Sequence, residues 1–318
     1  MDALSKPRVV AVGGPTATGK TALSVALAKE FGGEIINADS MQVYKNLNVG
    51  TAKPTADEMQ GVPHHLMGFQ DPAEPFSVSD YVALAGKVIE DIHARGKNVL
   101  LVGGTGLYAR SLLKAVPFTE NSRDDEIRGN LEADFAADGI EPLYARLKEL
   151  DPEGAEGIHP NNTRRVIRAL EYCMVTGEPF SKQAKDSKAV ESPYDGKMLV
   201  LSFRDRETLY GRINLRVEQM FADGLLKEAE DYFKRYGTPG QTSVQAIGYK
   251  ELFPYFEGQC SLDEAKENIK RETRRYAKRQ LTWFRREEDA VWLFADDFDA
   301  PADLISAAED IARAHFED

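Results

Sequence analysis

Short apolar runs alternate with amphipathic stretches in the first third of the chain. Three runs are apolar enough to predict buried strands, at residues 8–12, 34–38 and 98–102. Helical periodicity follows at 22–31 and again at 77–95, where Ser77 and Asp80 have the spacing of a capping box. Strands that alternate with helices predict a parallel sheet with helices on its faces, which is an α/β fold.

The pattern changes from about Phe118. Residues 124–176 are almost wholly helical in pattern and are interrupted at Gly139, near Asp151 and near His159, while 182–198 is polar and predicts a loop. A strand at 198–203 is expected to rejoin the sheet. Further helices are predicted near 206–223, 225–236, 246–256 and 262–288, and after Pro301. We therefore expect a helical insertion at 118–198 in an α/β core made of 1–117 and 199–318.

Composition excludes several classes of protein. With 42% hydrophobic residues, general disorder is excluded, and no run approaches the ~18 apolar residues of a membrane span. The apolar run near the N-terminus is too short for a secretory signal, so a soluble cytoplasmic protein is expected. Cys173 and Cys260 form no CxxC pair, which argues against a Cys-rich zinc site. The net charge of −12, taken alone, argues against nucleic-acid binding.

The strongest motif follows the first predicted strand. It is Gly14-Pro15-Thr16-Ala17-Thr18-Gly19-Lys20-Thr21, which fits GxxxxGK[ST] in full and precedes a predicted helix. Backbone N–H groups and Lys20 would hold phosphate oxygens there, and the Thr21 hydroxyl can hold Mg²⁺. A ligand-free glycine-rich turn is the alternative, which the complete motif disfavours.

The strand at 98–102 lacks a feature of nucleoside triphosphatases. Those enzymes usually have an Asp after a later apolar strand, but this strand is followed by Gly103-Gly104-Thr105-Gly106. The absence of this Asp disfavours an ATPase. The Thr105 hydroxyl follows the strand where the acidic residue would be expected.

Polar residues also follow the second predicted strand. In open parallel sheets ligands bind at the carboxyl ends of strands, so Asp39 is expected close to the phosphate loop. It can act as a base or as a hydrogen-bond acceptor, and an equally open alternative is a helix N-cap. His64 and His65, being adjacent in an extended segment, point to opposite sides, which favours packing or substrate contact over a metal site.

Positive charge is concentrated near the C-terminus. Residues 270–286 hold eight basic residues and one acid, whereas solvated helix surfaces generally mix both signs. The helical periodicity places Arg274, Lys278 and Arg285 on one side, with a second stripe beside them at Arg275, Arg279 and Arg286. We interpret this helix as a nucleic-acid contact, with Trp283 and Phe284 as core anchors.

Several segments together resemble one family. GGPTATGKT (13–21), DSMQVYK (39–45), GTAKP (50–54), PHHL (63–66), GGTGLY (103–108), HPNNTRRVIRALE (159–171), AIGYKE (246–251) and KRQLTWFR (278–285) occur in the order seen in bacterial tRNA dimethylallyltransferases, also called tRNA isopentenyltransferases. The resemblance spans residues 8 to about 290. It implies a P-loop NTPase-like parallel sheet core with a helical insertion domain.

The resemblance also implies a reaction. Dimethylallyl diphosphate would donate its five-carbon group to the exocyclic N6 amine of the adenosine 3′-adjacent to the anticodon, with release of diphosphate and assistance from Mg²⁺. Asp39, Thr105 and Lys20 would be catalytic. The diphosphate would lie on residues 14–21, with Arg212 and Arg216 on its far side, although a solvated helix face explains that pair about as well.

The tRNA anticodon stem-loop is the implied partner. The resemblance places its contacts at Asp39, Ser40, Met41, Gln42, Thr105, Arg128, Arg164, Arg165, Val166, Ile167, Arg168, Gly248, Tyr249, Lys250, Lys278, Arg279, Gln280 and Arg285. No membrane partner is expected, and a monomer is the default expectation.

Three alternatives remain open. An isopentenyltransferase that acts on free adenine nucleotides would leave the basic helix and the Arg164–Arg168 segment without a role. A small-molecule kinase is disfavoured by the missing Asp after Val102. A non-enzymatic RNA-binding protein is disfavoured by the complete phosphate motif.

Overall fold

The computed structural model describes residues 6–114, 124–182, 185, 191–237 and 243–317. The chain forms two compact units. Unit 1 is Met1–Leu113 with Pro193–Asp318, and unit 2 is Lys114–Ser192. These bounds differ by a few residues from the predicted insertion at 118–198, and β5 already begins at Asp195 rather than at Met198. Contact between unit 2 and tRNA stays a prediction.

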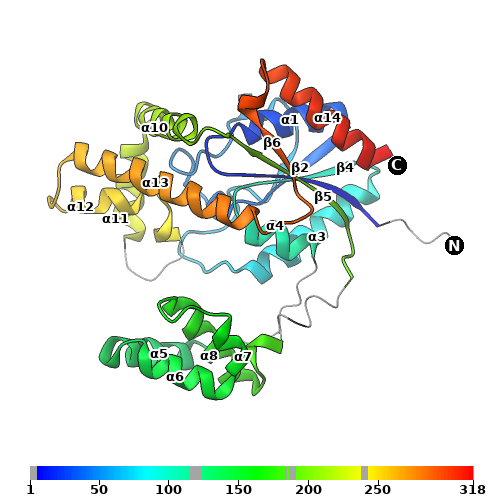
Figure 1. The fold of residues 1–318 in the computed structure, drawn as a ribbon. Coiled ribbons are helices and arrows are strands. Elements are labelled where there is room, and N and C mark those ends of the chain that lie inside the picture. The colour runs from blue at the N-terminus through cyan, green and yellow to red at the C-terminus, as the bar shows by residue number, and fades with distance from the viewer. Residues whose placement is uncertain (1–5, 115–123, 183–184, 186–190, 238–242, 318) are drawn as a thin grey trace. The chain divides into compact units, whose positions relative to one another are not determined.

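Unit 1 is built on a six-stranded parallel sheet with the order β3-β2-β4-β1-β5-β6 (Figure 1). The strands are β1 (Arg8–Gly13), β2 (Gly33–Asn37), β3 (His64–His65), β4 (Asn98–Val102), β5 (Asp195–Ser202) and β6 (Val291–Phe294). In the centre of the sheet, Val10 of β1 pairs with Leu100 of β4. The predicted α/β fold with a parallel sheet is confirmed.

Both faces of the sheet are apolar, as expected for parallel strands covered on both sides. One face presents Val9, Ala11, Val99, Leu101 and Val200 to helices that include α3 (Val78–Ala94) and α4 (Gly106–Leu113). The other face presents Val10, Val12, Leu100, Leu199 and Leu201 to α1 (Lys20–Glu30) and α14 (Pro301–Glu317). Figure 1 shows these helix pairs on opposite sides of the sheet.

The remaining helices of unit 1 lie mostly in its C-terminal half. They are α2 (Ala56–Met59), α10 (Arg206–Ala222), α11 (Leu225–Tyr236), α12 (Phe253–Phe256) and α13 (Leu262–Phe284), with short 3-10 turns η1 (Ser243–Gln245), η2 (Lys250–Leu252) and η3 (Ala295–Asp297). Ser77 caps α3 in the predicted capping box with Asp80.

Two of the predicted helices were wrong in part. The helix expected at 262–288 ends at Phe284, and a tight turn then leads into β6, which was not predicted. The helix expected at 246–256 consists of the 3-10 turn η2 followed by the single turn of α12. Neither Gly nor Pro marks the end of α13, so the sequence carries no strong stop signal there.

Unit 2 is a small helical unit of α5 (Asp125–Asp138), α6 (Glu141–Leu150), α7 (Pro152–Glu156) and α8 (Thr163–Thr176). The predicted breaks at Gly139, Asp151 and His159 all fall between these helices. Its core is formed by Leu131, Leu143, Leu147, Ala155, Ile158, Val166, Ile167, Ala169 and Leu170. Among the described residues of both units, no helix has the length and apolar character needed to cross a membrane.

Candidate active site

The phosphate loop leaves the carboxyl end of β1 in a conformation that needs glycine. Gly14 has φ 135°, and a Cβ at this residue would lie 2.2 Å from the carbonyl oxygen of Leu201. The Thr18 hydroxyl donates to the carbonyl of Pro15 at 2.9 Å and closes the loop, after which α1 begins at Lys20. The loop therefore has the strand–turn–helix setting that phosphate binding requires.

Lys20 lies in the phosphate loop, and little negative charge lies close to its ammonium group. Its Nζ donates to the carbonyl of Pro15 at 2.7 Å. Burial, and then the nearby charge of Arg216, lower the pKa of Lys20 to about 7, although the Asp39 carboxylate acts in the opposite direction. A bound anion would restore the charged form, because it supplies the countercharge that the protein lacks here.

The two arginines of α10 reach this loop in different ways. Arg212 Nε donates to the carbonyl of Ala17 at 3.0 Å, and its guanidinium lies over the ring of Phe203. Arg216 Nε is buried and has no hydrogen-bond partner among the residues that the structure describes. Burial lowers the pKa of Arg216 below its usual range, with Asp39 opposing that effect. Arg216 is thus the better placed of the two to meet an anion on the loop.

Asp39 follows β2 and uses one carboxylate oxygen as a cap. Its Oδ1 accepts from the backbone N–H of Met41 at 2.9 Å and more weakly from that of Gln42 at 3.4 Å. Oδ2 has no hydrogen-bond partner among the described residues. The two alternatives left open by the sequence are therefore compatible, because one oxygen caps the turn and the other is available to a ligand.

Thr105 lies against the Asp39 turn. Its Oγ1 accepts from the backbone N–H of Ser40 at 3.0 Å and donates to Ser40 Oγ at 3.2 Å. The two chain segments are pressed together, since a Cβ at Gly103 would lie 2.2 Å from the carbonyl of Ala38. The structure thus brings Thr105 and the Asp39 segment to the same edge of the sheet.

Gln280 joins the phosphate loop to the glycine turn after β4. Its Oε1 accepts from the backbone N–H of Thr16 at 3.0 Å, and its Nε2 donates to the carbonyl of Gly104 at 2.9 Å. Gln280 is only 5% exposed. Both ends of its amide are therefore engaged within the protein, which leaves little of it for the predicted tRNA contact.

Small residues let α13 approach these turns closely. A Cβ at Gly106 would lie 2.0 Å from the Trp283 ring, and one at Gly13 would lie 2.5 Å from the Phe284 ring. Phe284 is fully buried, as expected of a core anchor.

Tyr276, which was not singled out from the sequence, lies on α13 one turn before Gln280. Burial, and then the Asp39 carboxylate, raise the pKa of Tyr276, while its neighbours Thr105 and Gln280 lower it. The hydroxyl therefore stays protonated beside Thr105 and can donate a hydrogen bond. The i, i+4 spacing from Gln280 is the signal that could have found it.

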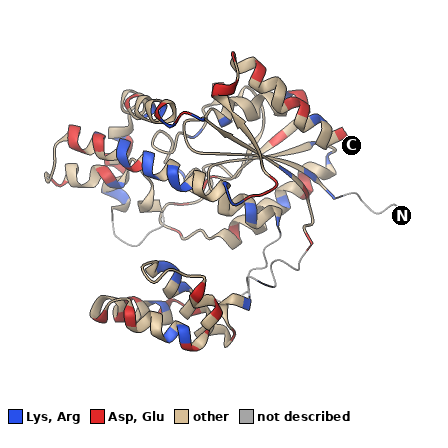
Figure 2. Cartoon of the chain, in the orientation of Figure 1, with Lys and Arg blue, Asp and Glu red and all other residues tan. Residues whose placement is uncertain are grey.

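Figure 2 shows that Lys and Arg residues recur along α13. Together with those of the turn that follows Phe284, they divide into paired and unpaired groups. Arg274 donates to Asn214 Oδ1 at 2.6 Å, and Arg275 lies 2.6 Å from the Glu272 carboxylate. The unpaired group is exposed and has no ion-pair partner in the described part of the chain: Lys278, Arg279, Arg285 and Arg286.

Unit 2 shows the same division. Arg128 and Arg168 each donate to Oε2 of Glu171 at 3.0 Å, and Glu171 is fully buried. Arg164 and Arg165 are exposed and form no ion pair with any residue that is described. Val166 and Ile167, which were also expected to contact tRNA, have side chains buried in the core of this unit, and the expected contact stays a prediction.

Residues 248–250 were predicted to contact tRNA. Among the described residues, no hydrogen bond joins them to the phosphate loop. The side chain of Tyr249 is completely buried in this structure, and the expected tRNA contact at Tyr249 stays a prediction. Gly248 has φ 100° and donates its N–H to Glu251 Oε2 at 2.8 Å, and Lys250 is half-exposed. His65 pairs with Glu34, and His64 hydrogen-bonds the carbonyl of Val62, so both histidines have partners within the protein.

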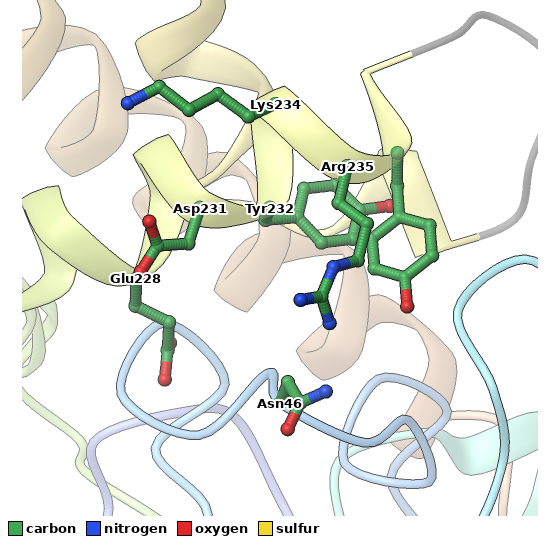
Figure 3. Close-up of a pocket in the computed structure, with 7 residues that line it drawn as sticks. Asn46, Glu228, Asp231, Tyr232, Lys234 and Arg235 are labelled. Carbon is green, nitrogen blue, oxygen red and sulfur yellow. The ribbon is translucent and has the colours of Figure 1, made fainter.

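A cavity of about 710 Å³ lies between α11 and the loop that carries Asn46 (Figure 3). It is lined by Asn46, Glu228, Asp231, Tyr232, Lys234, Arg235 and Tyr236. None of these residues was predicted to belong to the site. The lining of this cavity includes no residue of the phosphate loop and neither Asp39 nor Thr105.

Comparison with known proteins agrees with these features. The family model described as IPP transferase matches residues 42–287. The tRNA dimethylallyltransferase of Halalkalibacterium halodurans is 48% identical over 294 residues, which cover 92% of this chain and 93% of the relative. That of Lachnoclostridium phytofermentans is 46% identical over 299 residues, which cover 94% of this chain and 95% of the relative.

Solved structures of similar proteins cover nearly the whole chain. The full-length tRNA isopentenylpyrophosphate transferase from Bacillus halodurans has 45% identity and a TM-score of 0.74, and the match covers 98% of this chain and 97% of that one. A eukaryotic dimethylallyltransferase acting on tRNA has 31% identity and a TM-score of 0.82, and the match covers 97% of this chain and 80% of that one. The resemblance seen in the motifs is thereby confirmed, and the chain belongs to the IPP transferase family.

Proposed function

We propose that this chain transfers a dimethylallyl group from dimethylallyl diphosphate to the exocyclic N6 amine of the adenosine 3′-adjacent to the anticodon of tRNA. One observation carries the proposal: a phosphate loop, a carboxylate with one unengaged oxygen and a hydroxyl meet at one edge of the sheet. Near full-length relatives named tRNA dimethylallyltransferase support it. The C–O bond of the allyl diphosphate breaks, the N6–C bond forms, and one proton leaves N6.

The diphosphate side of the reaction is assigned to the phosphate loop. As the C–O bond breaks, negative charge grows on the departing diphosphate. Lys20, Arg216 and the backbone N–H groups of the loop are suited to stabilise it, because both cations lack a full countercharge in the ligand-free protein. We assign Thr105 to the bridging oxygen, to which its hydroxyl would donate in place of the 3.2 Å bond to Ser40 Oγ.

The adenosine side is assigned to Asp39. An adenine amine is a weak nucleophile because its lone pair is delocalised into the ring. The unengaged Oδ2 of Asp39 accepts the hydrogen bond, and then the proton, of N6, while Oδ1 keeps the turn capped. The target base lies in the stack of the anticodon loop and has to be extruded to reach this carboxylate.

The residues present fit a magnesium ion that is held largely by substrate. Among the described residues, none hydrogen-bonds the Thr21 hydroxyl, and no group of three or more His, Cys, Asp or Glu could hold a metal by itself. In phosphate sites Mg²⁺ usually takes one or two protein ligands together with phosphates and water. We therefore propose Thr21 as one ligand; when bound, the ion neutralises charge on the diphosphate.

The tRNA contacts are assigned to exposed cations without an ion-pair partner. In unit 1 these are Lys278, Arg279 and Arg285, and in unit 2 they are Arg164 and Arg165. Arg128 and Arg168 are held in place by Glu171 and are proposed as secondary contacts. We further propose that the chain acts as a monomer in the cytoplasm, where its tRNA substrate is found.

A transferase for free adenine nucleotides is the second candidate. It shares the phosphate loop, but it gives no role to the exposed and unpaired cations of α13. A kinase is disfavoured further, because β4 leads into Gly103-Gly104-Thr105 instead of an acidic residue.

One assay separates these functions. The purified protein is incubated with labelled dimethylallyl diphosphate, Mg²⁺ and either unmodified tRNA or AMP. We expect label in tRNA only. A matched tRNA with guanosine in place of the target adenosine should take up none, because it lacks the N6 amine. Absence of label in the normal tRNA would overturn the proposal, and label in AMP would favour the second candidate.

A further inference from the structure

The turn that carries Asp39 is tied to a downstream loop by one side chain. The backbone N–H of Gln42 donates the weaker of the two hydrogen bonds that Asp39 Oδ1 accepts. Its side-chain Nε2 donates to the carbonyls of Thr51 and Ala52, each at 3.1 Å. The position of the loop 47–53 therefore bears directly on the position of the Asp39 turn.

That loop is held from α11 by a single carboxylate. Glu228, in the first turn of α11, accepts from the backbone N–H of Asn48 at 3.0 Å, of Val49 at 2.9 Å and of Gly50 at 3.1 Å. Figure 3 shows Glu228 pointing from α11 toward the loop that carries Asn46. Three successive N–H groups aimed at one anion form a nest, and bonds to a charged acceptor are stronger than neutral ones.

Tyr249 completes the anchor. Its hydroxyl donates to Glu228 Oε1 at 2.5 Å, and its ring is completely buried. Burial, and then the charge of Glu228, raise the pKa of Tyr249, so the hydroxyl keeps its proton and remains a donor. A Cβ at Gly50 would lie 2.4 Å from the Tyr249 ring, so the loop approaches this closely only because residue 50 is glycine.

These bonds form a continuous path from α11 through the loop to Gln42 and Asp39. None of them includes a residue of the phosphate loop 14–21. We propose that Glu228 is a positioning residue that holds the Asp39 turn in place for the tRNA half of the reaction; this inference rests on the proposed function. It predicts that loss of the carboxylate affects tRNA use and spares the binding of dimethylallyl diphosphate.

The test is Glu228→Gln, which keeps the size of the side chain but replaces one acceptor oxygen by an NH₂ group. That group would face backbone N–H donors, so part of the nest is lost. We expect kcat/KM for tRNA to fall about tenfold or more, with KM for dimethylallyl diphosphate within about threefold of wild type. The kcat values are normalised to the fraction of protein that binds the diphosphate substrate, which removes effects of misfolded protein.

The matched control is Asp231→Asn, the same chemical change on the same helix. Asp231 is exposed and pairs with Lys227 at 2.5 Å. It should retain wild-type kinetics toward both substrates. Tyr249→Phe removes one donor and should give a smaller loss in the same direction; it replaces Glu228→Gln if that variant fails to fold.

Two further measurements test the path itself. Hydrogen exchange of the peptide covering 47–53 should be faster in Glu228→Gln, whereas the peptide covering 14–21 should be unchanged. The double variant Gln42→Ala with Glu228→Gln should lose less than the product of the two single losses, because both act through one loop.

The inference is overturned if a folded Glu228→Gln protein uses tRNA as well as wild type, or if its KM for dimethylallyl diphosphate rises as much as its kcat/KM for tRNA falls. Unchanged exchange at 47–53 overturns it as well. The exchange experiment needs no turnover, so it stands even if wild-type protein fails to label tRNA. Failure of the proposed function and failure of this inference are thus told apart.

Discussion

Gln280 Oε1 accepts a hydrogen bond from the backbone N–H of Thr16 across 264 positions of sequence. This bond, together with that of Nε2 to Gly104, makes α13 a support of the phosphate loop. Gln280→Ala leaves both backbone groups without a partner in a buried place. We expect the free energy of unfolding to fall by about 2 kcal/mol and KM for dimethylallyl diphosphate to rise.

Denaturant unfolding and steady-state kinetics check this prediction. The exposed Gln259, changed to Ala, serves as the control and should change neither quantity. A Gln280→Ala protein with normal KM for the diphosphate but weak tRNA binding would instead favour a direct tRNA contact at this residue.

Asp39 is expected to combine a cap with a catalytic acceptor, and two variants separate these roles. Asp39→Asn keeps an oxygen for the N–H of Met41 but can no longer take a proton. We expect kcat to fall about 100-fold or more with tRNA affinity nearly unchanged. Asp39→Ala should add a loss of about 1 kcal/mol in stability, because the cap is removed as well. Near-normal turnover of Asp39→Asn would reduce Asp39 to a cap.

The pKa of Lys20 predicts a pH dependence. Because the ligand-free protein lowers that pKa to about 7, Lys20 loses its charge as the pH rises through 7. We expect kcat/KM for dimethylallyl diphosphate to fall above this pH, since the charged form of Lys20 is the one proposed to bind the diphosphate. Lys20→Arg keeps its charge and should lose this pH dependence, although its activity is lower. An identical pH profile in both proteins would contradict the assignment.

The same shift also predicts a change in stability. A depressed lysine pKa makes the charged form costly in the folded state below about pH 7, and the cost fades as the pH rises toward 10.5. The ligand-free Lys20→Met variant should therefore be more stable than wild type, by an amount that shrinks across this window. Thermal unfolding at a series of pH values measures it.

The unpaired cations of α13 predict a salt-dependent contact with tRNA. Lys278→Glu with Arg279→Glu should weaken tRNA binding and reduce the slope of log affinity against log salt by about 2. Lys87→Glu with Lys97→Glu makes the same change in net charge at exposed residues of unit 1 outside α13. Equal effects of both pairs would mean that only net charge matters.

The buried carboxylate of Glu171 leads to a prediction about the stability of unit 2. Glu171→Gln weakens the hold on Arg128 and Arg168 and should cost unit 2 about 3 kcal/mol, which hydrogen exchange of its helices can measure. Glu132→Gln, which removes an exposed partner of Arg128, should cost less than about 1 kcal/mol. Similar losses from both changes would contradict the structural role of Glu171.

Patterns within short stretches of sequence predicted the features that depend on residues close together in the chain. Apolar runs located β1, β2 and β4, and the complete phosphate motif located the turn after β1. The burial of Val166 and Ile167 was also readable, because they share a helical face with Leu170. The ion pair of Arg275 with Glu272 was not predicted, although their i, i+3 spacing could have indicated it.

Features that depend on distant partners were not predictable in this way. No residue close to Gln280 in the sequence indicates its hydrogen bond to Thr16. Glu228 likewise lies far in sequence from the N–H groups that it binds. The four residues of β6 follow α13 without a breaker and pair only with β5, so their strand character comes from the sheet. Tertiary contact decided each of these cases.

The support of the phosphate loop by α13 also has a consequence for how the protein is made. The phosphate motif is complete as a sequence once residue 21 has been translated, yet its turn is braced by Gln280 and packed under Phe284. A nascent chain that has emerged only as far as β5 carries every residue of the motif without that brace. We therefore expect the proposed diphosphate site to become firm only late in synthesis, after α13 has left the ribosome and folded back onto the sheet.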